Sequence, residues 1–155
     1  MWERRTPDET IEVAIDGYKT VAYSFGAGDE VLLCLNGGPG LPCDYLREPH
    51  APLADHGYRV VAYDQLGCGR SDKPKDPSLW TIARYVEEVE TLRQALGLGR
   101  VHLLGQSWGG WLSIEYALKI GRRRVGKECR ARWSPHPSKN NPTRLPPAVL
   151  PPYPP

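Results

Sequence analysis

A short apolar run at residues 101–104 leads into Gly105-Gln106-Ser107-Trp108-Gly109-Gly110, and this feature constrains the fold most strongly. Apolar residues then recur at helical spacing, at Trp111, Leu112, Ile114, Ala117 and Leu118. Gly-x-Ser-x-Gly between a strand and a helix predicts a tight turn that presents the serine hydroxyl at the end of a sheet. The residues two before and two after such a serine must be small, as Gly105 and Gly109 are. We therefore expect Ser107 to be a nucleophile beside the positive end of a helix.

Further strands are indicated before this turn. Alternating runs at 11–15 and 18–25 flank Asp16-Gly17, which predicts a β-hairpin. Continuous apolar runs at 30–35, 59–63 and 100–104 are typical of strands buried on both faces.

The segments between these strands favour helices. Residues 82–96 have the spacing of an amphipathic helix, with Thr81 as its cap and Gly97 at its end. Residues 43–56 are expected to be helical in part, interrupted at Pro49 and Pro52. The pattern predicts an α/β fold, with a mostly parallel sheet after an antiparallel opening hairpin.

Loops at the carboxyl ends of parallel strands carry the site in such folds. One of these loops, Asn36-Gly37-Gly38-Pro39-Gly40, has adjacent glycines that let backbone N–H groups point into a cleft and donate to an oxyanion. A flexible turn is the plainer interpretation of the glycines alone. The loop lacks the Gly-Lys-Ser/Thr ending and the Gly-x-Gly-x-x-Gly pattern of phosphate-binding loops, so we expect no nucleotide cofactor.

Three motifs stand in order along the chain, and together they resemble the prolyl iminopeptidase family of α/β-hydrolases. The motifs are Asn36-Gly37-Gly38-Pro39-Gly40, Asp64-Gln65-Leu66-Gly67-Cys68-Gly69-Arg70-Ser71-Asp72 and Gly105-Gln106-Ser107-Trp108-Gly109-Gly110. The resemblance covers roughly residues 8–119. It implies that Ser107 is the nucleophile and that the backbone of Trp108, Gly37 and Gly38 forms the oxyanion hole. It also implies that the loop at Asp64 and Gln65 shapes the cleft floor without taking part in the chemistry.

The sequence departs from the family in two places. Asn36 stands where the family usually has histidine, and its side chain can still donate and accept hydrogen bonds. The triad order of the fold is Ser, then Asp or Glu, then His. After Ser107 the only acids are Glu115 and Glu128 and the only histidine is His136, none of them in a suitable context. We therefore expect no triad acid or triad histidine in this chain, and low activity from the chain alone.

Charge and proline content change sharply near residue 121. Residues 1–120 carry 12 basic and 17 acidic side chains, whereas residues 121–155 carry eight basic side chains, one acid and nine of the 16 prolines. We interpret 1–120 as a partial α/β-hydrolase domain and 121–155 as a basic, Pro/Arg-rich disordered tail in a non-native reading frame or at a mispredicted gene end. Three more strand–helix units of the fold need on the order of 90 residues.

Composition narrows the remaining classes. With 155 residues and 40% hydrophobic content, the chain is expected to form one domain without a signal peptide or membrane span, and to act in the cytoplasm. The four cysteines lack metal-site spacing, so we expect no metal and no other cofactor. We expect no nucleic-acid or membrane partner, although the basic, proline-rich residues 121–155 leave a binding role open. The oligomeric state is not determined by the sequence.

The function that the resemblance implies is release of an N-terminal residue, typically proline, from a small peptide through an acyl-enzyme. An esterase, lactonase or amidase of the same fold, acting on another small acyl substrate, remains an alternative. A non-catalytic remnant or binding module is the alternative from a different class.

Overall fold

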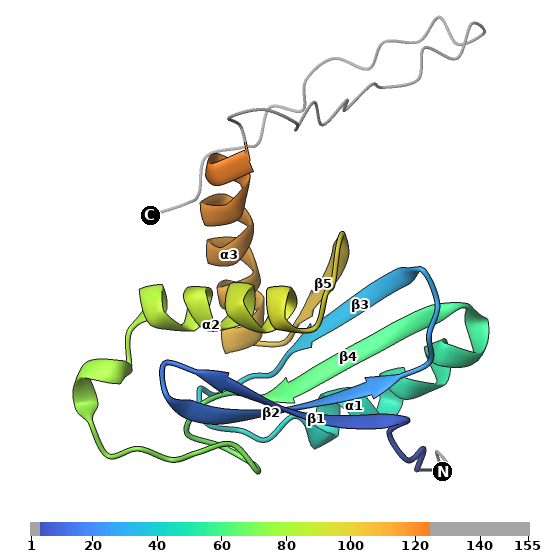
Figure 1. The fold of residues 1–155 in the computed structure, drawn as a ribbon, viewed down its shortest axis with the longest axis horizontal. Coiled ribbons are helices and arrows are strands. Elements are labelled where there is room, and N and C mark those ends of the chain that lie inside the picture. The colour runs from blue at the N-terminus through green and yellow to red at the C-terminus, as the bar shows by residue number, and fades with distance from the viewer. Residues whose placement is uncertain (1–3, 125–155) are drawn as a thin grey trace, which may run out of the picture.

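The computed structural model describes residues 4–124 and shows a five-stranded sheet with helices on both faces (Figure 1). The strands are β1 (Glu9–Ile15), β2 (Tyr18–Phe25), β3 (Glu30–Leu35), β4 (Tyr58–Asp64) and β5 (Val101–Gly105). The helices are α1 (Asp44–His50), the short 3-10 turns η1 (Ala51–His56) and η2 (Pro77–Leu79), α2 (Ile82–Ala95) and α3 (Trp108–Arg124). The expected α/β architecture is confirmed.

The sheet has the strand order β1-β2-β4-β3-β5. β1 and β2 form the predicted antiparallel hairpin, and β2 is also antiparallel to β4. β3 is parallel to both β4 and β5, with Leu33 opposite Val61 on one side and Leu103 on the other. The carboxyl ends of these three strands therefore meet at one edge of the sheet, so the loops that follow them come together.

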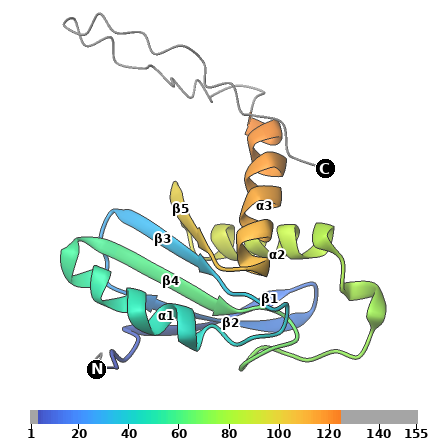
Figure 2. The same ribbon diagram turned by 180° about the vertical axis from the view of Figure 1, so that it is seen from behind.

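Alternation along the strands builds one core on each face of the sheet. Leu33, Val61 and Tyr63 pack with the apolar sides of α2 and α3, whereas Cys34 and Val60 pack with α1 and η1. Figure 2 shows α1 lying across the face opposite to α2 and α3. The continuous apolar runs of β3 and β4 follow from burial on both faces.

The helix ends agree with the capping signals except at one proline. The Thr81 hydroxyl accepts a hydrogen bond from the Arg84 N–H, and Gly97 has a left-handed φ of 63°. Pro49, expected to interrupt its helix, lies inside α1, and the change to a 3-10 turn comes only after His50. Since α1 has seven residues, Pro49 falls in its last turn, where few backbone bonds remain to be lost.

The predicted boundary near residue 120 falls inside an element, because α3 continues to Arg124. The remainder of the predicted tail, residues 125–155, lies outside the described residues, as do residues 1–3. Among the helices described, none combines the length and the apolar character needed to cross a membrane.

Candidate active site

Ser107 lies in a sharp turn between β5 and α3. Its φ is 54°, a left-handed value that costs a non-glycine residue about 1–3 kcal/mol. Hydrogen bonds fix the turn on both sides: the Gln106 N–H donates to the Leu35 carbonyl at 3.2 Å, and the Trp111 N–H donates to the Ser107 carbonyl at 3.2 Å. The Ser107 side chain is exposed at the end of the sheet. This is the strand–turn–helix geometry expected from the sequence.

The two glycines that flank Ser107 are required by close backbone packing. A Cβ atom on Gly105 would run into the carbonyl group of Gly109, and one on Gly109 would run into the carbonyl group of Leu35. By contrast, a Cβ on Gly110 would meet the Gly105 carbonyl oxygen only at 3.6 Å, an ordinary contact. Small residues are therefore needed at positions 105 and 109, where the motif has them.

The loop after β3 lies directly against this turn. The Gly37 N–H donates to the Tyr45 hydroxyl at 2.6 Å, and the Tyr45 hydroxyl donates to Gln106 Oε1 at 2.9 Å. Gly38 follows with a φ of 120°, and its peptide bond to Pro39 is cis. The Gly37 N–H is therefore already used by Tyr45. The Gly38 N–H, by contrast, has no hydrogen-bond partner in the described part of the chain. The contact of Tyr45 with this loop was not foreseen from the sequence.

Asn36 is completely buried where the family usually has histidine. Its Nδ2 donates to the Leu41 carbonyl and lies 3.8 Å from the sulfur of Cys68, so it holds the glycine loop closed on itself. Asn36 Oδ1 is also enclosed, and within residues 4–124 it has no hydrogen-bond partner. The amide thus keeps the donor role in this loop that the sequence suggested.

Gln65 connects the three loops of the site. Its fully buried side chain donates from Nε2 to the Asn36 carbonyl at 3.1 Å. Its Oε1 accepts from the indole N–H of Trp108, also at 3.1 Å. One amide therefore sets the distance between the glycine loop and the start of α3 and fixes the orientation of the Trp108 ring.

Asp64 is buried and is saturated with hydrogen bonds. Its carboxylate accepts from the Tyr23 hydroxyl, the Cys43 N–H and the Arg70 N–H, each at 2.9 Å. Burial and the bond to Asp64 raise the pKa of Tyr23 to about 12, so this phenol stays a donor. A Cβ atom on Gly69 would collide with the same carboxylate. Asp64 thus acts as the anchor of its loop, which supports the expected structural role.

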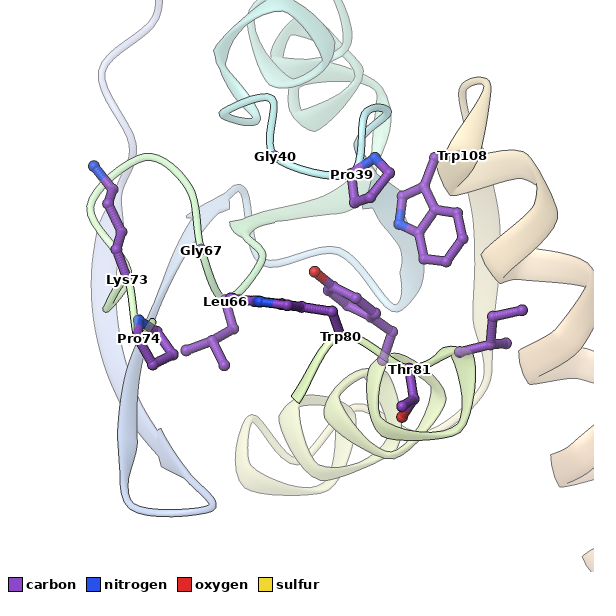
Figure 3. A pocket seen from close by; sticks show the side chains of 11 residues that line it. Pro39, Gly40, Leu66, Gly67, Lys73, Pro74, Trp80, Thr81 and Trp108 are labelled. Atoms are coloured by element: carbon purple, nitrogen blue, oxygen red, sulfur yellow. The ribbon is translucent and has the colours of Figure 1, made fainter. Parts of the chain in front are cut away.

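A pocket of about 430 Å³ opens beside this turn (Figure 3). Its walls come from the loop after β3, the loop after β4 and the first turns of α2 and α3, and are formed by Pro39, Gly40, Leu66, Gly67, Lys73, Pro74, Trp80, Thr81, Ile82, Tyr85 and Trp108. Trp108 and Pro39 place the pocket next to Ser107 and Gly38, although neither of these two lines it. The sequence did not indicate Trp80 and Tyr85 as pocket residues, because Tyr85 has the spacing of an ordinary apolar position in the helix and Trp80 lies in the segment just before it.

Neither His50 nor His102 is placed to serve Ser107 as a base, and the exposed His56 ends η1 just before the amino end of β4. The His50 Nδ1 lies 2.7 Å from the Leu46 carbonyl oxygen, within its own helix region. The His102 Nε2 is paired with Glu30 Oε2 at 2.7 Å near the amino end of β5, away from the carboxyl end that carries Ser107. His136 and Glu128 lie outside the described residues. Within residues 4–124, no three His, Cys, Asp or Glu side chains are grouped as metal ligands.

Known proteins share this arrangement. The α/β hydrolase fold family matches residues 30–127. A proline iminopeptidase from Saccharolobus solfataricus is 46% identical over 113 residues, which are 67% of this chain and 36% of that protein. One from Heyndrickxia coagulans is 48% identical over 93 residues, or 60% of this chain and 31% of that protein. The chain therefore spans about a third of the length of these curated relatives.

Solved structures give the same result. The crystal structure of proline iminopeptidase from Mycobacterium smegmatis matches with a TM-score of 0.67 and 33% identity, over 72% of this chain and 40% of that one. An epoxide hydrolase from Vigna radiata matches with a TM-score of 0.63 and 32% identity, over 71% and 35%. The strand order, the turn at Ser107 and these matches agree: the chain belongs to the α/β-hydrolase fold family and within it is similar to proline iminopeptidases.

Proposed function

We propose that Ser107 is the nucleophile of a serine peptidase that releases an N-terminal residue, typically proline, from small peptides. The observation that carries the proposal is the position of Ser107 at a strained turn, with the glycine loop held against it by Tyr45 and Gln106. The similarity to proline iminopeptidases supports the choice of substrate. We propose the cytoplasm as the place of action, as expected from the sequence.

The reaction begins with attack of Ser107 Oγ on the carbonyl carbon of the scissile bond, which yields a tetrahedral oxyanion. The N–H groups of Gly38 and Trp108 are the donors assigned to that oxyanion, because neither donates a hydrogen bond within the described residues. The positive end of α3 adds to this stabilisation. Collapse expels the leaving amine and forms an acyl-enzyme, which water then hydrolyses.

A general base must take the Ser107 proton, and the described residues offer none. We therefore propose that the chain alone turns over substrate slowly, because residues 4–124 supply a nucleophile and oxyanion donors but no triad acid or histidine. Catalysis without a complete triad still exceeds the uncatalysed rate by on the order of 10³-fold.

Hydrolysis of proline p-nitroanilide by the purified chain tests this proposal. We expect a weak rate that Ser107→Ala abolishes and that Ser78→Ala, an exposed serine in η2, leaves unchanged. A rate typical of a complete enzyme would overturn the claim that the base is missing. A rate that survives Ser107→Ala would overturn the role of Ser107, whereas no rate above background from either protein would favour a non-catalytic binding module.

The similarity to an epoxide hydrolase structure favours a second candidate, another hydrolase of the same fold. An esterase, lactonase or amidase would use the same Ser107 and the same oxyanion donors. A panel of p-nitrophenyl esters, lactones and amides, compared with proline p-nitroanilide, separates these activities. Preference for the acetate ester over every aminoacyl substrate would favour the esterase.

A further inference from the structure

The pocket beside Ser107 is lined by a tyrosine hydroxyl that has no hydrogen-bond partner among residues 4–124. Tyr85 is only 4% exposed, and its hydroxyl makes no hydrogen bond with any residue that the structure describes. That oxygen is not among the fully enclosed polar atoms, in contrast to the Tyr63 hydroxyl on the neighbouring strand. Because Tyr85 lines the pocket, its hydroxyl is open to the pocket and available to a bound molecule.

The Tyr85 hydroxyl is a hydrogen-bond donor over the whole neutral range. Burial raises the pKa of Tyr85 to about 12, with nearby Glu88 acting in the same direction. Because no described residue accepts a hydrogen bond from it, this hydroxyl is free to donate to a ligand acceptor such as a peptide carbonyl oxygen. The hydroxyl therefore selects for a ligand that brings an oxygen acceptor.

The remaining walls are mostly apolar, and their aromatic rings are held by packing and hydrogen bonds. The rings of Trp80 and Tyr85 stack at 6.4 Å between centroids, and Tyr85 meets Trp108 edge-on at 5.4 Å. A Cβ atom on Gly67 would come within 3.0 Å of the Trp80 ring, so that ring rests on the loop backbone. The hydrogen bond from the Trp108 indole N–H to Gln65 fixes the Trp108 ring on the opposite wall of the pocket. Such preformed aromatic surfaces suit an apolar side chain.

Charge on the walls argues against a protonated amine. The lining includes no carboxylate, and Lys73 at the rim carries the only formal charge among the lining residues (Figure 3). An N-terminal amine is cationic at neutral pH and would meet a like charge here. The free amino end of a substrate therefore belongs elsewhere, and the pocket suits an uncharged part of the peptide.

We propose that this pocket is the subsite for the residue that follows the scissile bond: its apolar side chain lies against Trp80 and Trp108, and Tyr85 donates to its carbonyl oxygen. This assignment rests on the proposed peptidase function. Tyr85 is then a specificity-determining residue that positions the leaving part of the peptide, and the activity favours short peptides with an apolar second residue over those with glycine there.

Direct binding tests the proposal without any turnover. The full chain is titrated with N-acetyl-L-leucinamide, which supplies an apolar side chain and uncharged carbonyls. Binding is followed by the indole N–H resonances in nitrogen–proton correlation spectra. We expect saturable shifts for Trp80 and Trp108 and none for Trp111, which lies on the exposed side of α3 and outside the pocket.

Matched ligands and variants decide the assignment. N-acetylglycinamide, without the side chain, and cationic L-leucinamide should bind more weakly. Tyr85→Phe should weaken N-acetyl-L-leucinamide about two- to tenfold, whereas Tyr58→Phe, on the opposite core, should not. Near-ultraviolet circular dichroism of each variant confirms that the aromatic packing persists.

The proposal is overturned if L-leucinamide binds at least as tightly as its acetylated form, or if Tyr85→Phe binds like the original protein. Absence of any saturable shift at millimolar ligand would overturn it as well. Ser107→Ala should bind N-acetyl-L-leucinamide normally. Loss of the Ser107 role therefore leaves this result standing, and the two proposals fail separately.

Discussion

Two regions of contrasting construction meet at Ser107. One is the loop cluster at the carboxyl ends of β3 and β4, and the other is the outer side of β5 and α3. In the loop cluster, polar side chains are buried and nearly all hydrogen-bonded, with Asp64 and Gln65 at its centre. On the outer side, large apolar side chains are open, with Trp111 57%, Ile114 62% and Leu118 56% exposed. Among the described strands, β5 pairs with β3 alone.

This difference shows where the site obtains its rigidity. Buried hydrogen bonds specify one arrangement, because each unmade bond leaves a desolvated group without compensation. Exposed apolar side chains add no comparable stability, because the gain of about 1.5–3 kcal/mol for a large apolar side chain comes only when it is buried. The position of Ser107 therefore depends chiefly on the loop cluster. Substitutions in the loop cluster should lower the free energy of unfolding strongly, and substitutions on the outer side should change it little.

The largest expected effect is that of Asp64→Ala. The change leaves three buried or partly buried donors unpaired, from Tyr23, Cys43 and Arg70. At about 1–3 kcal/mol for each such donor, we expect a loss on the order of 3–9 kcal/mol in the free energy of unfolding. Urea denaturation measures it. Asp72→Ala, in the same loop, should cost far less, since the Asp72 side chain accepts from the Lys19 N–H alone; equal losses would contradict the anchoring role of Asp64.

A pH-dependent effect of intermediate size is expected where α3 is fixed to α2. Glu90 accepts hydrogen bonds from Arg93, Tyr116 and Gln94, and these lower its pKa to about 2. A carboxylate with a lowered pKa stabilises the fold above its ordinary pKa and loses that contribution as the pH falls toward the folded value. We expect the free energy of unfolding to fall by about 1–3 kcal/mol between about pH 5 and about pH 2.5.

Glu90→Gln provides the comparison for this titration. It cannot ionise, so its stability should fall less over the same pH range, measured by urea denaturation at each pH. Burial raises the pKa of neighbouring Glu88, whose titration acts in the opposite direction and is common to both proteins. Parallel pH profiles for the two proteins would show that Glu90 does not hold α3 through its charge.

The smallest effect on stability is expected on the outer side. The double substitution Ile114→Lys and Leu118→Lys should change the free energy of unfolding by less than about 0.5 kcal/mol. It should nevertheless reduce self-association, because exposed apolar surface beside an open strand edge promotes aggregation. Light scattering after size-exclusion chromatography measures association. Leu112→Lys, on the buried side of the same helix, should unfold the protein. A large loss from the outer substitutions would mean that this face is packed in solution.

The sequence by itself determined the local structure. The spacing of apolar residues, the turn and capping residues, and the need for small residues beside Ser107 were enough to predict the hairpin, the buried strands, the Thr81 cap and the turn at Ser107. These features depend on residues a few positions apart, whose spacing is fixed by the geometry of strands, helices and turns. The similarity to proline iminopeptidases was likewise visible in the three motifs.

Only the tertiary structure decided how distant groups meet. Gln65 reaches both Asn36 and Trp108, and Tyr45 takes up the Gly37 N–H, through pairings that no local pattern encodes. The spacing of Tyr85 predicts a core position of α2, whereas in the structure its hydroxyl is open to the pocket. Which atoms come within hydrogen-bond distance depends on strand order and register across tens of residues, and a shift of one residue turns each side chain to the opposite face.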